Sequence, residues 1–357
     1  MFTMMSTYLI VQKRNPQYWV YPSKPQLIGY FAEPRFRSEE TKFPNEQNAL
    51  GSLKYLNKHA DLNAMSDSFQ ILKTIAKRFQ KPLEFTKTGS LKPLENWISN
   101  HSEIEEVKRA KYFMDRESLT TILNTPLKTE WTLFLKYVNK AFYLFMNKEI
   151  STEYLICLEA LNNCLFNDMP DRHTQVTMRE DDLFFYEVYE IQVGGKTIIY
   201  SAKIPGVDCD KVVNNLEELK AATHVDLDIC WETRGILPEC LSCCTTWTKA
   251  ALISAEHVII AHPTHLGYTV NGKKVELMNS CSIQRTTIDD LIDAQNKCIT
   301  YKAYKAPEFA WNFLDDFLTF AEREVVRGAE TSTSLYEFKL EMGSAVSCRR
   351  IEDISSN

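Results

Sequence analysis

The sequence predicts an α/β fold in which mixed β-structure is flanked by helices within a single domain. Segments with alternating apolar and polar residues fill the middle of the 357-residue chain. Segments with helical periodicity lie between them and after them, an order typical of α/β architectures. The chain is also 44% hydrophobic, which is enough to build a sizeable core.

Net charge and cysteine usage indicate which classes of protein this chain can belong to. The net charge of −6 argues against indiscriminate binding to nucleic acid, although a local basic groove is compatible with it. The ten cysteines include Cys157, Cys164, Cys230 and Cys298, which sit in apolar stretches. This pattern is typical of free thiols in a reducing compartment. No apolar run reaches 18 residues, so we expect a soluble intracellular protein.

The first 150 residues mix short strands with helices. We expect strands over residues 26–31 and 52–56, and a helix over 63–80, where apolar residues recur at helical spacing. A second helix is expected over 116–123. Residues 130–147 are rich in aromatic side chains, and their pattern fits either a helix or a strand.

The centre of the chain predicts a hairpin followed by a third strand. Residues 183–193 alternate, Gly194-Gly195 is a good two-residue turn, and residues 196–204 return. Residues 222–231 alternate again. A helix over 241–254 follows.

The last third completes the domain. A short buried strand is expected over 257–263, a hairpin turn at Asn271-Gly272, and a periodic helix over 309–325. An alternating strand over 335–342 would close the sheet. We therefore assign residues 1–345 to one domain and 346–357 to a polar C-terminal tail.

Five stretches, taken in order, resemble one known family. They are DRESLTTILNTPL (115–127), EYLICLEAL (153–161), SAKIPGVD (201–208), VDLDICWETRGI (225–236) and WNFLDDFLTF (311–320). Each motif is weak alone, but their order and separation are specific. Together they resemble the DXO family of decapping and pyrophosphohydrolase exoribonucleases, which act on RNA 5′ ends.

The resemblance implies a single DXO-like domain with a central cleft. In active members, carboxylates from three segments hold two divalent metal ions. These ions would activate a water molecule and stabilise charge on the phosphate. A lysine two residues after one carboxylate, and a glutamine on the next helix, complete the pocket.

When the family's functional residues are carried over to this sequence one by one, the first three motifs are retained only in part. Arg116 falls on the family's arginine, and Glu159 keeps its carboxylate. The glutamate and aspartate of the E-V-D motif fall on Lys203 and Pro205. Asp208 retains the outer aspartate.

The later motifs also depart from the family. Without a gap, the E-L-K pair falls on Asp228 and Cys230, whereas a two-residue slide places Asp226 and Asp228 there. No lysine follows in either register. The helix glutamine falls near Ala250.

These replacements predict a degenerate site with no catalysis, no resident metal and no cofactor. Mg²⁺ requires near-octahedral oxygen ligation, and a lysine at position 203 would repel it. We expect the Lys203 ammonium to substitute in part for the metal by pairing with Glu159 or Asp228. Pro205 should end its strand, because it lacks a ladder donor.

The resemblance therefore implies a nuclear pseudoenzyme in RNA processing. The degenerate member that it resembles most is a germline piRNA-pathway adaptor at heterochromatic loci. This implies protein partners, Rhino and Deadlock, and protection of nascent piRNA-precursor transcripts from 5′-end processing and termination. RNA 5′ ends are a further candidate partner.

Two alternatives stay open at this point. One is a residual metal-dependent RNA 5′-end hydrolase that uses Glu159, Asp208 and Asp228. The other is a protein-interaction scaffold with an unused cleft, whose docking surface lies in 130–145 or on 309–325. The basic stretch Lys108, Arg109 and Lys111 fits either a path for an RNA backbone or a solvated face.

Overall fold

The computed structural model describes most of the chain. The described residues are 8–10, 18–34, 46–58, 60, 91–125, 130–146, 158, 161–170, 183–229, 236–270, 273–297, 306–328, 333–341 and 345–351. The helix expected over 63–80, together with Glu159 and Cys230, lies outside these ranges. None of the helices in the described part of the chain is both long and apolar enough to span a bilayer.

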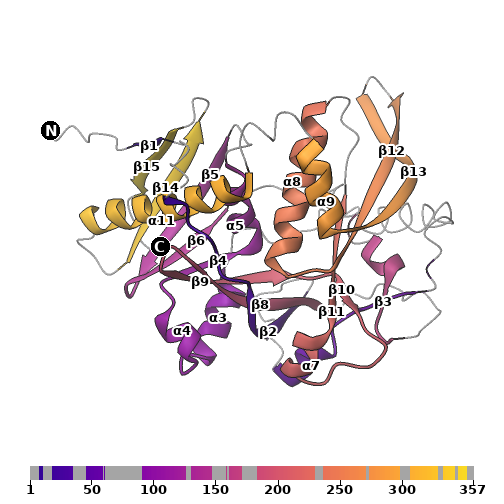
Figure 1. Ribbon diagram of the computed structural model, residues 1–357, viewed down its shortest axis with the longest axis horizontal. Coiled ribbons are helices and arrows are strands. Elements are labelled where there is room, and N and C mark those ends of the chain that lie inside the picture. The colour runs from indigo at the N-terminus through magenta and orange to yellow at the C-terminus, as the bar shows by residue number, and fades with distance from the viewer. Residues whose placement is uncertain are drawn as a thin grey trace.

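Two mixed sheets form the framework (Figure 1). The nine-stranded sheet has the order β1-β15-β14-β5-β6-β4-β9-β8-β2. Its strands are β1 (Tyr8–Ile10), β2 (Gln26–Pro34), β4 (Tyr112–Asp115), β5 (Trp131–Val138), β6 (Ala141–Phe145), β8 (Leu183–Val193), β9 (Lys196–Lys203), β14 (Thr333–Glu341) and β15 (Ala345–Ile351). The single mixed α/β domain with mixed sheets is thus confirmed.

The six-stranded sheet has the order β13-β12-β11-β10-β3-β7. Its strands are β3 (Tyr55–Leu56), β7 (Phe166–Asn167), β10 (Gly206–Asp208), β11 (Thr223–Ile229), β12 (His257–Val270) and β13 (Lys273–Thr287). The long β12–β13 hairpin projects from one end of the molecule (Figure 1).

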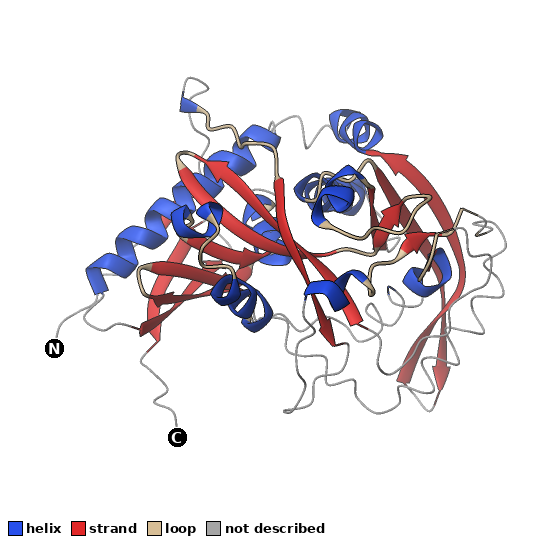
Figure 2. Cartoon of the chain, turned by 90° about the horizontal axis from the view of Figure 1, so that it is seen from below, coloured by secondary structure: helices blue, strands red, loops and turns tan. Residues whose placement is uncertain are grey.

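Helices cover both sheets (Figure 2). They are α1 (Glu46–Leu50), α3 (Lys92–Asn100), α4 (Glu105–Arg109), α5 (Arg116–Leu123), α7 (Leu216–Ala221), α8 (Ile236–Leu252), α9 (Ile288–Lys297) and α11 (Ala306–Gly328). Helix α11 packs on the nine-stranded sheet through Phe317, whose ring meets Trp131 and Phe338 edge-on. Helix α3 packs on the opposite face of that sheet, where the Trp97 ring lies against Gly29 of β2.

The chain passes from one sheet to the other at Pro205. Strand β9 ends at Lys203 in the nine-stranded sheet, and β10 starts at Gly206 in the six-stranded sheet. Proline has no N–H for a ladder, so neither strand can run through this position. The predicted end of the strand at Pro205 is confirmed, and the structure adds that it is a crossing between sheets.

The ambiguous segment 130–147 forms two strands rather than a helix. Strands β5 and β6 pair antiparallel around Asn139 and Lys140, whose φ angles are 51° and 66°. Two consecutive positive φ angles are typical of a two-residue hairpin turn. One face of this hairpin is buried against α11, and the other carries half-buried aromatic rings, among them Phe134 and Phe145.

Several other expected elements are present, although some begin or end at different residues than predicted. Helix α5 begins and ends where predicted, and Gly194 and Gly195 turn between β8 and β9 with φ angles of 58° and 77°. Strand β12 is longer than the predicted 257–263. Strand β14 does not close its sheet, because β15 and β1 continue beyond it. Residues 345–351, most of which the sequence places in the tail, form β15.

Candidate functional site

The first part of the site is a buried ion pair between α5 and β11. Helix α5 follows Asp115, whose side chain accepts the Ser118 N–H at 2.6 Å and so caps the helix. The next residue, Arg116, donates from Nη1 to Asp226 Oδ1 at 3.2 Å. Both side chains are almost fully buried. Burial raises the pKa of Asp226, although the positive charges of Arg116 and Lys249 act in the opposite direction.

The second carboxylate, Asp228, lies two residues along β11 and therefore on the same face as Asp226. Its Oδ2 accepts the Thr246 hydroxyl at 2.5 Å, and its Oδ1 accepts the Ile229 N–H at 2.9 Å. Helix α8 also brings Lys249 Nζ to 3.9 Å from Asp228 Oδ1. Each aspartate on this face thus has a cation beside it.

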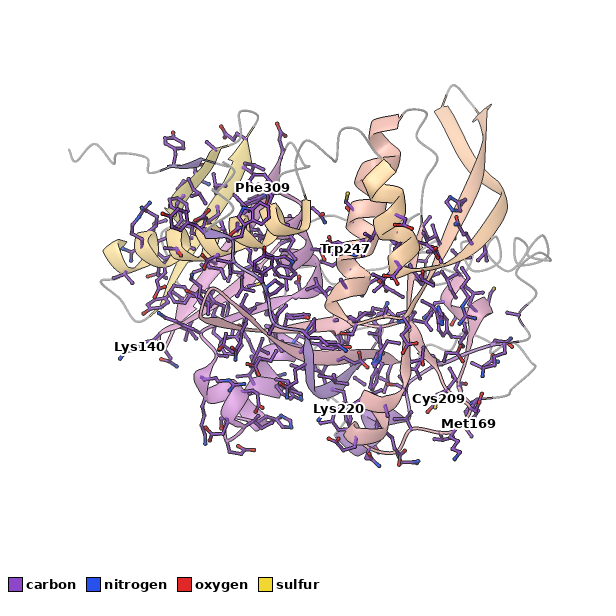
Figure 3. The ribbon with its side chains drawn as sticks, viewed as in Figure 1. Lys140, Met169, Cys209, Lys220, Trp247 and Phe309 are labelled. Atoms are coloured by element: carbon purple, nitrogen blue, oxygen red, sulfur yellow. The ribbon has the colours of Figure 1, made fainter. Side chains whose placement is uncertain are left out.

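Five buried side-chain atoms on α5, α8, β11 and the residue after α5 have no hydrogen-bond partner within the part of the chain that the structure describes. They are Ser118 Oγ, Thr120 Oγ1, Asn124 Nδ2, Trp247 Nε1 and Asp226 Oδ2. Trp247 lies on α8 near the middle of the molecule (Figure 3). Buried polar atoms are normally paired with protein or ordered water, so these elements carry polar atoms that could accept further partners.

A third carboxylate, Glu187 of β8, links the nine-stranded sheet to β11. It is fully buried. Its Oε2 accepts the Tyr189 hydroxyl at 2.5 Å, and its Oε1 lies 2.8 Å from His224 Nε2. Burial lowers the pKa of His224, but the charge and hydrogen bond of Glu187 outweigh this effect and raise it overall. The Glu187 carboxylate therefore favours the protonated form of His224.

Asp208 faces the other side of the six-stranded sheet. In the antiparallel ladder between β10 and β11, Asp208 lies opposite Thr223. Side chains alternate along a strand, so Asp208 shares a face with Thr223, whereas Asp226 and Asp228 point to the opposite face. Its partners also differ from those of Asp226 and Asp228. Asp208 Oδ2 accepts a hydrogen bond from Arg285 Nη2 at 3.1 Å, and Asp208 Oδ1 lies 3.4 Å from Lys58 Nζ.

The structure also describes three further predicted site residues, Lys203, Pro205 and Ala250. Lys203 belongs to the nine-stranded sheet, and its Nζ lies 3.4 Å from the centroid of the Phe184 ring. Pro205 is half-buried in the crossing between sheets. Ala250 is fully buried in the apolar core. The structure thus brings together Arg116, Asp226 and Asp228.

The basic stretch before α5 is neutralised by glutamates. Lys108 pairs with Glu105 at 2.6 Å, and Lys111 pairs with Glu322. Arg109 donates to both oxygens of Glu190, at 2.7 and 2.6 Å. Such pairing makes a continuous basic path for an RNA backbone unfavourable, because each phosphate would compete with a carboxylate.

The described residues do not fit a two-metal centre. They contain no group of three or more His, Cys, Asp or Glu side chains arranged to hold a metal ion. Asp226 and Asp228 lie beside Arg116 and Lys249, and Asp208 is directed to the opposite face. A divalent ion would have to displace these internal cations.

Comparison with solved structures finds several proteins whose fold is similar to that of this chain. Rai1 of Scheffersomyces stipitis, in complex with (3′-NADP)⁺ and a calcium ion, superposes with a TM-score of 0.68 at 10% identity, covering 98% of this chain and 94% of that one. A mutant Rai1 of S. pombe in complex with 3′-FADP gives 0.66 at 11% identity, covering 97% and 99%. The chain has the Rai1 fold.

The Rai1 fold extends over nearly the whole chain. Dxo1 of K. lactis, in complex with manganese, also matches, with a TM-score of 0.61 at 10% identity and 99% coverage of both chains. No family model and no curated protein matches at the level of sequence. The chain therefore shares the arrangement of its elements with these proteins, and the DXO-like fold expected from the five motifs is confirmed.

Sequence reasoning missed Lys249, Glu187 and His224. Lys249 follows Thr246 by three residues, a spacing that places both on one helix face and that could have indicated a shared target. Glu187 and His224 carried no comparable signal. They meet only because β8 and β11 from different sheets are brought together.

Proposed function

We propose that this chain is a non-catalytic protein of the DXO family that acts as an adaptor in nuclear RNA processing. The observation that carries the proposal is that each described carboxylate of the candidate site has a cation beside it. Asp226 pairs with Arg116, Asp228 lies near Lys249, and Asp208 pairs with Arg285. The solved relatives include proteins in complex with nucleotides and with calcium or manganese ions. Positive side chains beside these carboxylates would disfavour a divalent ion, which supports the non-catalytic assignment.

The finer assignment follows from the sequence resemblance. Among degenerate members, the chain resembles the Drosophila protein Cutoff. This supports a role in the germline piRNA pathway, in a nuclear complex with Rhino and Deadlock at heterochromatic source loci. In that role the protein would protect nascent piRNA-precursor transcripts from 5′-end processing and termination.

The register of β10 on β11 argues against the residual hydrolase. That alternative needs Asp208 and Asp228 to share one metal ion, yet the two side chains lie on opposite faces of the sheet. The pure scaffold remains the second candidate. It is favoured by the pairing of Lys108, Arg109 and Lys111 with glutamates, which weakens the case for RNA binding.

A hydrolysis assay tests the non-catalytic assignment. Purified protein is incubated with 5′-monophosphate, 5′-triphosphate and improperly capped RNA in the presence of Mg²⁺ or Mn²⁺. S. pombe Rai1 serves as the positive control and a Glu159→Ala variant as the matched negative. We expect equal, background-level product from the wild type and the variant. Metal-dependent turnover that the variant loses would overturn the proposal.

Binding measurements then separate the adaptor from the scaffold. Fluorescence anisotropy with 5′-monophosphate and 5′-hydroxyl RNA of one sequence reports whether a 5′ end is recognised. Co-expression with Rhino and Deadlock, followed by size-exclusion chromatography, reports the nuclear complex. We expect co-elution in the second experiment. Tight RNA binding in the first would favour an RNA-bound adaptor over a pure scaffold, and failure to co-elute would contradict the assignment to this complex.

A further inference from the structure

The nine-stranded sheet has a second face, turned away from α11, which α3 covers over part of its width. Helix α3 packs Leu94, Trp97 and Ile98 against the part of this face that β2, β8, β9 and β4 form. The strand register continues the face from Phe113 of β4 to Tyr143 of β6, whose rings stack 5.0 Å apart. The covered part therefore leads directly into the part that β6, β5, β14, β15 and β1 form. The outward side chains of these five strands are called the distal sheet surface below.

Apolar side chains continue across the distal sheet surface. The registers of β5, β14, β15 and β1 place Phe134, Leu335 and Tyr8 on this one face. The Phe134 ring stacks on that of Phe145 at 5.7 Å, and the Tyr8 side chain is 57% exposed. Phe134, Val138 and Leu335 belong to none of the three apolar clusters that the described residues form. An apolar surface of this kind marks a place where another molecule can bind.

Helix α11, the other surface considered for docking, offers little apolar contact area. Its large apolar side chains from Phe309 to Val325 are buried, and Val326 near its end is the exposed one in the described part of the helix. The distal sheet surface is therefore the better candidate for docking.

The charges on the distal sheet surface occur as acid–base pairs. The pairs are Arg349 with Glu337 at 2.8 Å, Lys339 with Glu341 at 3.1 Å, and, at the border with α3, Lys136 with Glu95 at 3.1 Å. Because the whole chain has a net charge of −6, two copies repel each other in general, and a surface with balanced charges is where they can approach. An RNA backbone is disfavoured there, since its phosphates would compete with the paired carboxylates.

The size of the distal sheet surface is compatible with a reversible contact. Its five strands are three to nine residues long. With strands about 4.8 Å apart and a rise of about 3.4 Å per residue, they span roughly 500 Å². A stable interface buries about 800 Å² on each partner, so a complex through this surface should be weak and depend on concentration.

We propose that the distal sheet surface binds a second copy of this chain, with the two sheets packed face to face about a two-fold axis. In such a dimer the same residues contribute from both copies, so the surface must be compatible with itself in charge. The balanced acid–base pairs meet this condition. The rings of Phe134 and Phe145 form the apolar centre of the contact and the charged pairs surround them, an arrangement typical of protein interfaces.

Sedimentation velocity of the full chain at about 1 to 100 μM tests this dimer. We expect the wild-type sedimentation coefficient to rise with concentration. Lys339→Glu makes the surface negative on both copies, so the dissociation constant should rise at least about tenfold. The matched control is Lys220→Glu on α7, well away from Lys140 at the β5–β6 turn (Figure 3). Lys220 also pairs with one glutamate, Glu217, so the control makes the same change in charge.

A second variant tests the apolar centre. Phe134→Ser removes a partly exposed ring and should also weaken the dimer, and circular dichroism checks that the variant is folded. If it is not folded, the comparison of Lys339→Glu with Lys220→Glu still decides. A wild type that stays monomeric over the whole range would overturn the proposal and leave the surface to a different protein. Equal weakening by the two lysine variants, or none by either, would place the contact elsewhere and overturn it as well.

Discussion

Arg116 and Asp226 form a buried ion pair that joins α5 to β11, with Nη1 and Oδ1 3.2 Å apart. Two charges at such burial are costly to remove from water and depend on each other for compensation. The pair therefore fixes the start of α5 against the strand that carries both aspartates of the candidate site. A metal ion at Asp226 would therefore have to displace the Arg116 guanidinium.

Removing one member of this pair should destabilise the fold strongly. Arg116→Ala would leave Asp226 buried without its guanidinium, and we expect a loss of about 3–5 kcal/mol in the free energy of unfolding. Urea denaturation measures it. The double variant Arg116→Met with Asp226→Leu removes both charges and should lose markedly less. Equal losses in the single and double variants would show that the charge pairing contributes little.

Stability should fall as the pH rises above 6.5, the ordinary pKa of histidine. The pKa of His224 is raised in the folded state from its ordinary value of 6.5. The folded state therefore binds the proton more tightly than the unfolded state. The stabilising contribution is complete below pH 6.5 and is lost as the pH increases through the folded pKa.

Chemical denaturation at a series of pH values from about 6 upward measures whether stability falls with pH. His224→Gln cannot be protonated, so its unfolding free energy should change less over the same range. A wild-type profile that rises with pH in this window, or a variant with the same slope as the wild type, would contradict the assignment.

Divalent cations should not stabilise the wild-type protein. A ligand that binds the folded state at 100 times its Kd would add about 2.7 kcal/mol to the free energy of unfolding. Because Asp226, Asp228 and Asp208 each lie beside a positively charged side chain, we expect the same Tm in Mn²⁺ and in EDTA. Differential scanning calorimetry measures it, with S. pombe Rai1 run alongside. A clear rise in Tm with Mn²⁺ would reveal a metal site.

The hairpin between β8 and β9 offers a matched pair of glycine substitutions. Gly194 and Gly195 both have positive φ, so alanine at either position should cost about 1–2 kcal/mol from the backbone alone. At Gly194 an added Cβ would also lie 2.3 Å from Asp315 Oδ1, whereas at Gly195 nothing lies within 4 Å. Gly194→Ala should therefore be the more destabilising by at least about 1 kcal/mol, because Asp315 must move.

Thermal unfolding of the two variants separates backbone strain from crowding. The Asp315 carboxylate also pairs with Lys196, so its displacement would weaken the contact of α11 with the hairpin. Equal losses for the two alanine variants would show that Asp315 moves without cost.

The sequence by itself determined the elements whose signals are local. Asp115 before Arg116 caps a helix, Gly194-Gly195 allows positive φ, and Pro205 stops a ladder, so α5, the β8–β9 hairpin and the end of β9 were all predictable. The order of five short motifs also indicated the DXO-like fold. These features depend on hydrogen bonding and backbone freedom within a few residues.

Tertiary structure alone decided which side chains meet. The alternation of residues 130–147 fits two periods, and only packing against α11 and β14 selected strands. The separation of Asp208 from Asp228 follows from the register of β10 on β11, which no single segment specifies. Lys249 reaches Asp228, and Glu187 reaches His224, because α8 and β8 pack against β11. Buried charges must find partners wherever the fold places them, and those partners are distant in sequence.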